Sequence, residues 1–182
     1  MAFSAGVPML LILAVALGKA PAPHAALVYS VLFAFFGTFG SAIPWARDAE
    51  RGWIHRLALT GIGMPALTVQ RLLTGALIDA IELLPSVIVI GVLYQTAAPD
   101  LVRLFLALVA SLLFANALGA LVASIAASLA ETALLSSVTA LLLLHAAGVF
   151  RTPAPGGFAD ALQRIVPFHY LHQAIVAALG AR

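Results

Sequence analysis

The chain has 182 residues, of which 63% are hydrophobic and 9% are charged, and its mean hydropathy is +1.11. Soluble domains carry about 25% charged residues, so a chain with so few charges predicts an integral membrane protein. The net charge of +2 and the lack of a Lys or Arg run argue against a nucleic-acid partner. With no cysteine, the chain has neither disulfides nor Cys-based metal sites.

Long apolar runs succeed one another along the chain. A bilayer core of about 30 Å needs about 20 apolar residues in a helix. The first run is short. A secretory signal usually has Lys or Arg before its apolar region, and none precedes this run, so it is interpreted as a short first membrane helix. The pattern predicts an all-α membrane protein with about five transmembrane helices, at residues 7–18, 25–45, 66–94, 101–129 and 132–150.

The densest cluster of charge lies between the second and third runs. On a helical projection Arg47, Asp48, Arg51 and His55 fall within about a third of the circumference. This predicts a short amphipathic helix over residues 46–59, lying at the membrane surface with its charged side turned to a partner. The alternative is a solvated loop whose charges keep it out of lipid.

Few polar groups interrupt the apolar runs. Asp79 and Glu82, at i and i+3 in the third run, share one helix face, and a charge at membrane depth costs about 3 kcal/mol or more. They are therefore expected to face the bundle interior, a water-filled cavity or a partner, unless they are paired or protonated. Asn116 in the fourth run and His145 in the fifth are the other candidates of this kind.

The C-terminal segment, residues 151–181, differs from the rest. Residues 151–157 are rich in Pro and Gly and predict a loop, followed by one or two amphipathic turns and a helix too short for a confident crossing. The segment is interpreted as extracytoplasmic or partly inserted. His169 and His172 are spaced to bind a metal or haem iron together, although boundary helices also carry His for interfacial anchoring.

The charged stretch resembles the cytosolic coupling region of ABC type-2 transporter permeases, where an acidic and basic cluster ends in Gly and a Leu-x-Leu-Thr-Pro run follows. The matching residues are Asp48, Glu50, Arg51, Gly52, Arg56, Leu57, Leu59 and Thr60. Gly61 replaces the family's Pro, and Gln70-Arg71 replaces its Gly-Lys. Gly148-Val-Phe-Arg-Thr-Pro153 and Pro167-Phe-His-Tyr170 match two later family elements in order.

The resemblance covers about residues 25–178 and lacks two family elements, a basic amphipathic helix before the first crossing and a final helix. It implies that residues 1–182 form a single transmembrane permease domain of an ATP-driven ABC exporter in a bacterial inner membrane. Basic residues are evenly divided between the two sides, so their distribution does not set the orientation. The orientation is taken from the resemblance instead. The charged stretch is then cytoplasmic.

The resemblance further implies a homodimer or a paired permease, in contact with membrane lipid and docked on a separate ABC ATPase subunit that binds the ATP. No Gly-x-x-x-x-Gly-Lys-Ser/Thr motif occurs in the chain, and we expect no catalytic residue, cofactor or metal in it. The implied ATPase-coupling residues are Arg47, Asp48, Glu50, Arg51, Gly52, His55 and Arg56. The candidates for polar residues along a translocation path are Asp79, Glu82, Asn116 and His145.

Two alternatives remain at this point. One is a proton-linked secondary transporter that uses Asp79, Glu82 and His145. The other is a non-transporting membrane subunit that binds haem or a metal through His145, His169 and His172. No residue in the sequence selects a substrate.

Overall fold

The computed structural model describes residues 10, 12–18, 20–59, 61, 63–151 and 153–180, apart from the side chains of Ala58 and Asp79. Within these residues, four helices are long and apolar enough to cross a membrane, namely α2 (Ala22–Glu50), α4 (Met64–Tyr94), α5 (Ala98–Ile125) and α6 (Leu129–Ala146). The shorter helices are α3 (Trp53–Ala58), α7 (Phe158–Ile165) and α8 (Pro167–Gly180). Every regular element in this part of the chain is a helix, which confirms the predicted all-α integral membrane fold.

The predicted first crossing, at residues 7–18, falls partly outside the described residues. Residues 12–17 are helical, and the side chains of Ile12 and Ala16 are buried in the largest core cluster. The full crossing therefore stays a prediction.

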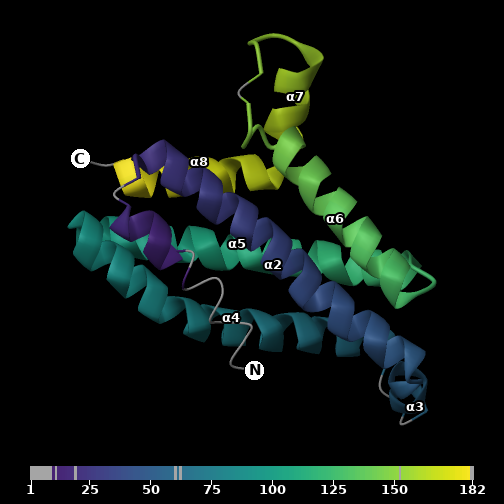
Figure 1. Cartoon of the computed structure of the whole chain (residues 1–182). Coiled ribbons are helices and arrows are strands. Elements are labelled where there is room, and N and C mark those ends of the chain that lie inside the picture. The colour runs from purple at the N-terminus through teal and green to yellow at the C-terminus, as the bar shows by residue number, and fades with distance from the viewer. Residues whose placement is uncertain are drawn as a thin grey trace.

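The long helices form a bundle in which α2 is the central element. It packs most extensively on α5 and also contacts α6 and α8, while α4 packs on α5 (Figure 1). The short α8 lies against both α2 and α5. Helices α3 and α7 project at different ends of the bundle (Figure 1). The bundle thus has one end carrying α3 and another carrying α7.

The close crossing of α2 and α5 depends on two glycines. A Cβ atom on Gly37 would lie 2.6 Å from the Cβ of Ala115, and one on Gly119 would collide with the carbonyl oxygen of Thr38. The two backbones therefore approach closely because these positions lack side chains, as is common where membrane helices pack.

The interior and the outer surface of the bundle are both apolar. Tyr29, Leu104, Leu108 and Ile175 are fully buried in the main core. An exposed apolar stripe follows α4 at spacings that suit one helix face, as expected where a helix meets lipid acyl chains. The stripe consists of Leu73, Leu77, Ile81, Leu84, Ile88 and Val92.

The predicted coupling helix at 46–59 is wrong as a single element. Helix α2 continues past the predicted boundary at residue 45 and ends at Glu50, and α3 begins at Trp53. Between them Gly52 adopts φ +71°, a left-handed conformation that glycine accepts at little cost. The chain turns there because the residues up to Glu50 favour the helix and Gly52 ends it.

The turn between α5 and α6 also differs from the predicted ranges, which placed it between residues 129 and 132. Helix α5 ends at Ile125 and α6 begins at Leu129, so Glu131 lies in the first turn of α6. The Ser128 hydroxyl accepts the Glu131 N–H, and the Glu131 carboxylate accepts the Ala127 N–H at 2.8 Å. This reciprocal cap sets the start of α6.

Candidate functional site: the charged end of the bundle

The residues predicted to couple to a partner gather at the α3 end of the bundle. Arg47, Asp48 and Glu50 lie in the last turn of α2, and Arg51 and Gly52 form the turn that follows. His55 and Arg56 lie on α3. The start of α6 lies at the same end, because its first residue bonds to Glu50. The structure therefore brings these residues together, but it gives the acids and the bases different surroundings.

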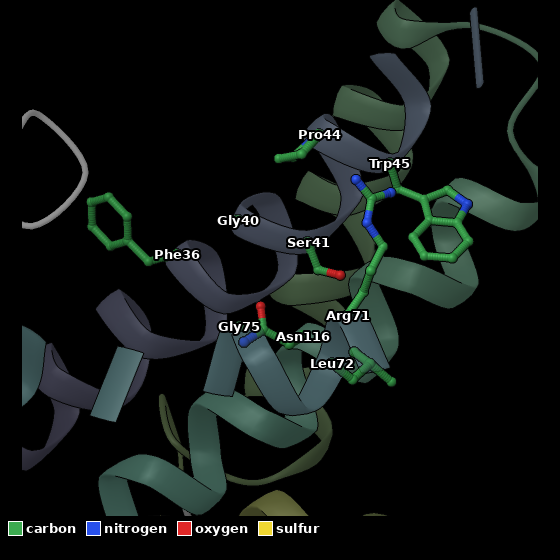
Figure 2. A pocket seen from close by; sticks show the side chains of 9 residues that line it. All are labelled: Phe36, Gly40, Ser41, Pro44, Trp45, Arg71, Leu72, Gly75 and Asn116. Atoms are coloured by element: carbon green, nitrogen blue, oxygen red, sulfur yellow. The ribbon is translucent and has the colours of Figure 1, made fainter. Parts of the chain in front are cut away.

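Asp48 is paired within the chain. Its carboxylate accepts a hydrogen bond from the guanidinium of Arg71, in the second turn of α4, and the two form an ion pair. The Arg71 guanidinium also lies over the indole of Trp45, 5.0 Å from the ring centroid (Figure 2). A salt bridge and a cation–π contact together join the end of α2 to the start of α4. Arg71 was not identified as a site residue from the sequence, although it is the first charged residue of the third run.

Glu50 is also held within the chain. One of its carboxylate oxygens accepts the backbone N–H of Leu129 at 2.7 Å. The first N–H groups of a helix lack intrahelical partners, and a carboxylate there also interacts favourably with the helix dipole. Glu50 therefore joins the end of α2 to the start of α6.

The bases of this end face outward. Arg47, Arg51, His55 and Arg56 are exposed, and within the described part of the chain none of them forms an ion pair. Arg56 lies over the indole of Trp53, 5.8 Å from its centroid, and Trp53 is 52% exposed. Asp48 is half-buried in its pair, whereas Glu50 and Glu131 are exposed while each bonds to a backbone N–H. The outward surface of this end therefore presents the arginines beside two carboxylates, together with an exposed aromatic ring.

Helix α3 is fixed to the bundle by its apolar side. Ile54 packs against a cluster of Ala42, Trp45 and Ala123, from α2 and α5. Leu57 is half-buried. Ile54 thus gives α3 a packed contact with two of the long helices.

A small cleft of about 150 Å³ opens beside the Asp48–Arg71 pair. Its lining comes from α2, α4 and α5, and includes Ser41, Arg71 and Asn116 (Figure 2). Asn116 is buried, so this predicted path residue lies at a polar point between three helices.

The other predicted path residues are not brought to one place. Asp79 and Glu82 lie on α4, which packs on α5, whereas His145 is exposed in the last turn of α6, which packs mainly on α2. Glu82 is half-buried, and the side chain of Asp79 lies outside the described residues. A relay from these carboxylates to His145 gains no support from this arrangement.

The predicted histidine pair has other partners. Nδ1 of His169 lies 3.0 Å from the carbonyl oxygen of Ala147 and 2.7 Å from Nε2 of Gln163, and its Nε2 lies 2.9 Å from Nε2 of Gln173. With its proton on Nδ1, His169 donates to Ala147 and accepts from Gln173. Nδ1 of His172 lies 2.8 Å from Oγ of Ser30. Across the described ranges, no group of three or more His, Asp or Glu is placed to hold a metal ion.

The fold and this end of it define the class first: the chain is a helical integral membrane protein whose densest cluster of charge lies at one end of the bundle. The sequence profile of the ABC-2 type transporters matches residues 2–179, so the chain belongs to the ABC-2 type transporter family. The chain is therefore a transporter permease subunit. Comparisons with curated proteins and with solved structures give no match.

Proposed function

We propose that this permease is the membrane subunit of an ATP-driven exporter and that a separate ABC ATPase subunit docks on its α3 end. The observation that carries the proposal is that the exposed arginines at this end form no ion pair within the described part of the chain. Asp48 and Glu50 are bonded within the chain, while Arg47, Arg51 and Arg56 face outward. A surface of this kind complements an acidic groove on a partner.

The mechanism is mechanical. Binding and hydrolysis of ATP change the relative positions of the ATPase subunits, and α3 receives this movement. Ile54 passes it to α2 and α5, the Asp48–Arg71 pair passes it to α4, and the Glu50–Leu129 bond passes it to α6. One displacement thus biases four helices together between inward-facing and outward-facing arrangements.

The assembly is proposed to contain two permeases, either two copies of this chain or this chain with a similar one, in a bacterial inner membrane. In this arrangement the α3 end faces the cytoplasm, where ATP is available. The ATPase supplies the nucleotide site, and the permease supplies the path.

The polar residues inside the spans are proposed to act in substrate passage. Asp79 and Glu82 share a face of α4, and Asn116 lines the cleft between α2, α4 and α5. Asp79→Asn is expected to lower ATP-dependent transport into inverted membrane vesicles without reducing membrane insertion. Unchanged transport by this variant would remove Asp79 from the path.

The docking proposal is tested by neutralising two outward bases. The variant Arg51→Gln/Arg56→Gln is expected to lose the ATPase subunit that co-purifies with the wild-type permease, and to lose permease-dependent stimulation of ATP hydrolysis. The matched control is Arg103→Gln/Arg164→Gln, which removes the same charge from two residues paired with Asp100 and Asp160. Equal retention of the ATPase by both variants contradicts the proposal, as does the absence of any ATPase from the purified wild type.

A further inference from the structure

A second pocket lies at the end of the bundle that carries α7. Its volume is about 420 Å³, and its lining includes His145 from α6, Arg151 from the following loop, and Phe158, Leu162 and Gln163 from α7. The lining is mainly apolar but includes two nitrogen bases and no acid. A ligand that fits this composition has an anionic group joined to an apolar body.

The two bases are available to a ligand. Both side chains are exposed, and neither has a hydrogen bond or an ion pair among the described residues. Asp160, the acid of α7, is already engaged: its carboxylate accepts the Gly156 N–H at 3.1 Å and pairs with Arg164 at 2.9 Å. Arg151 therefore supplies a fixed positive charge at the pocket, and His145 supplies an N–H donor.

The outer face of α7 has the pattern of a helix that lies on a membrane. Phe158, Leu162 and Ile165 follow one another at i, i+4 and i+7 and are 85%, 39% and 76% exposed. Asp160 and Arg164 pair on another side of the helix. Such a short amphipathic helix buries its apolar stripe at the boundary between headgroups and acyl chains.

The exposed face of α6 continues this apolar surface. Leu134, Val138 and Leu141 are exposed at helical spacing, and His145 falls on the same face in the last turn. An acyl chain lying along this face therefore ends beside the two bases. A phosphate at that point lies at headgroup depth, because α6 is long enough to span the membrane up to its last turn.

The pocket is held in shape by contacts behind it. Gln163 is buried on the inner side of α7, and its side-chain amide nitrogen lies 2.7 Å from Nδ1 of His169, a nitrogen that also lies 3.0 Å from the carbonyl oxygen of Ala147. Gly148 adopts φ +75°, and a Cβ there would meet the Gln163 side chain at 2.7 Å. The position of α7 over α6 is thus set without a ligand, so a bound lipid has little ordering to induce.

We propose that this pocket binds an anionic phospholipid of the adjacent leaflet, with its phosphate against Arg151 and His145 and an acyl chain along α6. The assignment is independent of ATP and of the ATPase, so it is tested on the permease alone.

The test uses the absence of cysteine from the chain. A single cysteine at Ala161, which is exposed on α7 outside the pocket lining, carries a fluorophore in lipid nanodiscs. The quencher is a nitroxide-labelled lipid, present at a low fraction in phosphatidylcholine. Labelled phosphatidylglycerol is expected to quench this fluorophore roughly fivefold more effectively than labelled phosphatidylcholine. A ratio of this size is the effect of one basic group near a membrane surface.

Arg151→Gln/His145→Gln is expected to bring the two lipids to equal quenching, while Arg151→Lys keeps the preference because it keeps the charge. The control Arg103→Gln removes a charge outside both the pocket and α7 and is expected to keep the preference. Each variant is compared only when its elution profile matches the wild type. Equal quenching by both lipids in the wild type overturns the proposal. So does a preference that survives Arg151→Gln/His145→Gln, or a fluorophore shielded from both lipids by a second copy of the chain.

Discussion

The carboxylate of Glu50, the last residue of α2, accepts a 2.7 Å hydrogen bond from the backbone N–H of Leu129, the first residue of α6. Ser128, in the α5–α6 turn, and Glu131, in the first turn of α6, cap the same helix end. The start of α6 is thus set partly by a residue from a distant part of the chain. Glu50, an acid of the charged stretch, therefore bonds within the permease itself.

Replacing Glu50 by Ala is expected to lower the free energy of unfolding in detergent micelles by about 1 kcal/mol, because a helix start loses an acceptor and a favourable charge. Glu50→Gln keeps an acceptor and is expected to lose less. The measurement is equilibrium unfolding followed by helix content. Binding of the ATPase by Glu50→Gln is expected to stay at the wild-type level, and its loss would return Glu50 to the docking surface.

The Asp48–Arg71 pair is expected to show a coupling energy of about 0.5–1 kcal/mol in a double-mutant cycle, since both side chains are partly exposed to solvent screening. Arg71→Ala is expected to cost more than Asp48→Ala, because it also removes the contact with Trp45. The exchanged variant Asp48→Arg/Arg71→Asp tests orientation. It is expected to recover the ion pair but not the contact with the indole, so a full recovery would show that the cation–π contact contributes nothing.

Gly119→Ala is expected to destabilise the bundle by about 1–3 kcal/mol, because the new methyl group meets the backbone of Thr38 and forces α2 and α5 apart. The matched control is Gly75→Ala on α4, where a Cβ meets nothing within 4 Å. There the change is expected to be neutral or to stabilise the helix by up to about 1 kcal/mol. Similar unfolding curves for the two variants would show that the close crossing is absent.

The first turn of α7 is expected to loosen in acid. The Gly156 N–H, and secondarily Arg164, hold the pKa of Asp160 below its usual range. A carboxyl whose pKa is lower in the folded state stabilises that state above its unfolded pKa, and the effect is lost as pH falls through the folded pKa. A spin label at position 161 should therefore become more mobile in that acidic range. Asp160→Asn should show no such transition, and a transition of equal size in it would assign the change to another group.

The sequence was sufficient to predict the membrane class, the helical fold and the family, because these depend on hydrophobic length and on short motifs that local composition reveals. The ends of the helices were less predictable. Residues 46–50 read as a separate amphipathic helix, yet they extend α2, because no local signal before Gly52 stops the helix. Likewise Glu131 reads as a turn but is a cap, which becomes visible only once Ser128 is recognised as its partner.

The roles of the charged residues depended on tertiary contacts. Asp48 and Glu50 look equivalent to Arg51 and Arg56 in a charge pattern, and only the fold shows that the acids bond to Arg71 and Leu129. The pocket beside α7 was missed for the same reason. The sequence contained one usable signal for it, the i, i+4, i+7 spacing of Phe158, Leu162 and Ile165.

The most direct test of ATPase docking is site-specific crosslinking from α3. Because the chain has no cysteine, a photoactivatable probe on a single cysteine at exposed His55 reports one position only, and the same probe at exposed Ala154, at the α7 end, is the control. In native membranes, a crosslink to the ATPase subunit is expected from position 55 and none from position 154. A crosslink from position 154 alone, or labelling of position 55 by an impermeant reagent outside intact cells, would contradict the account.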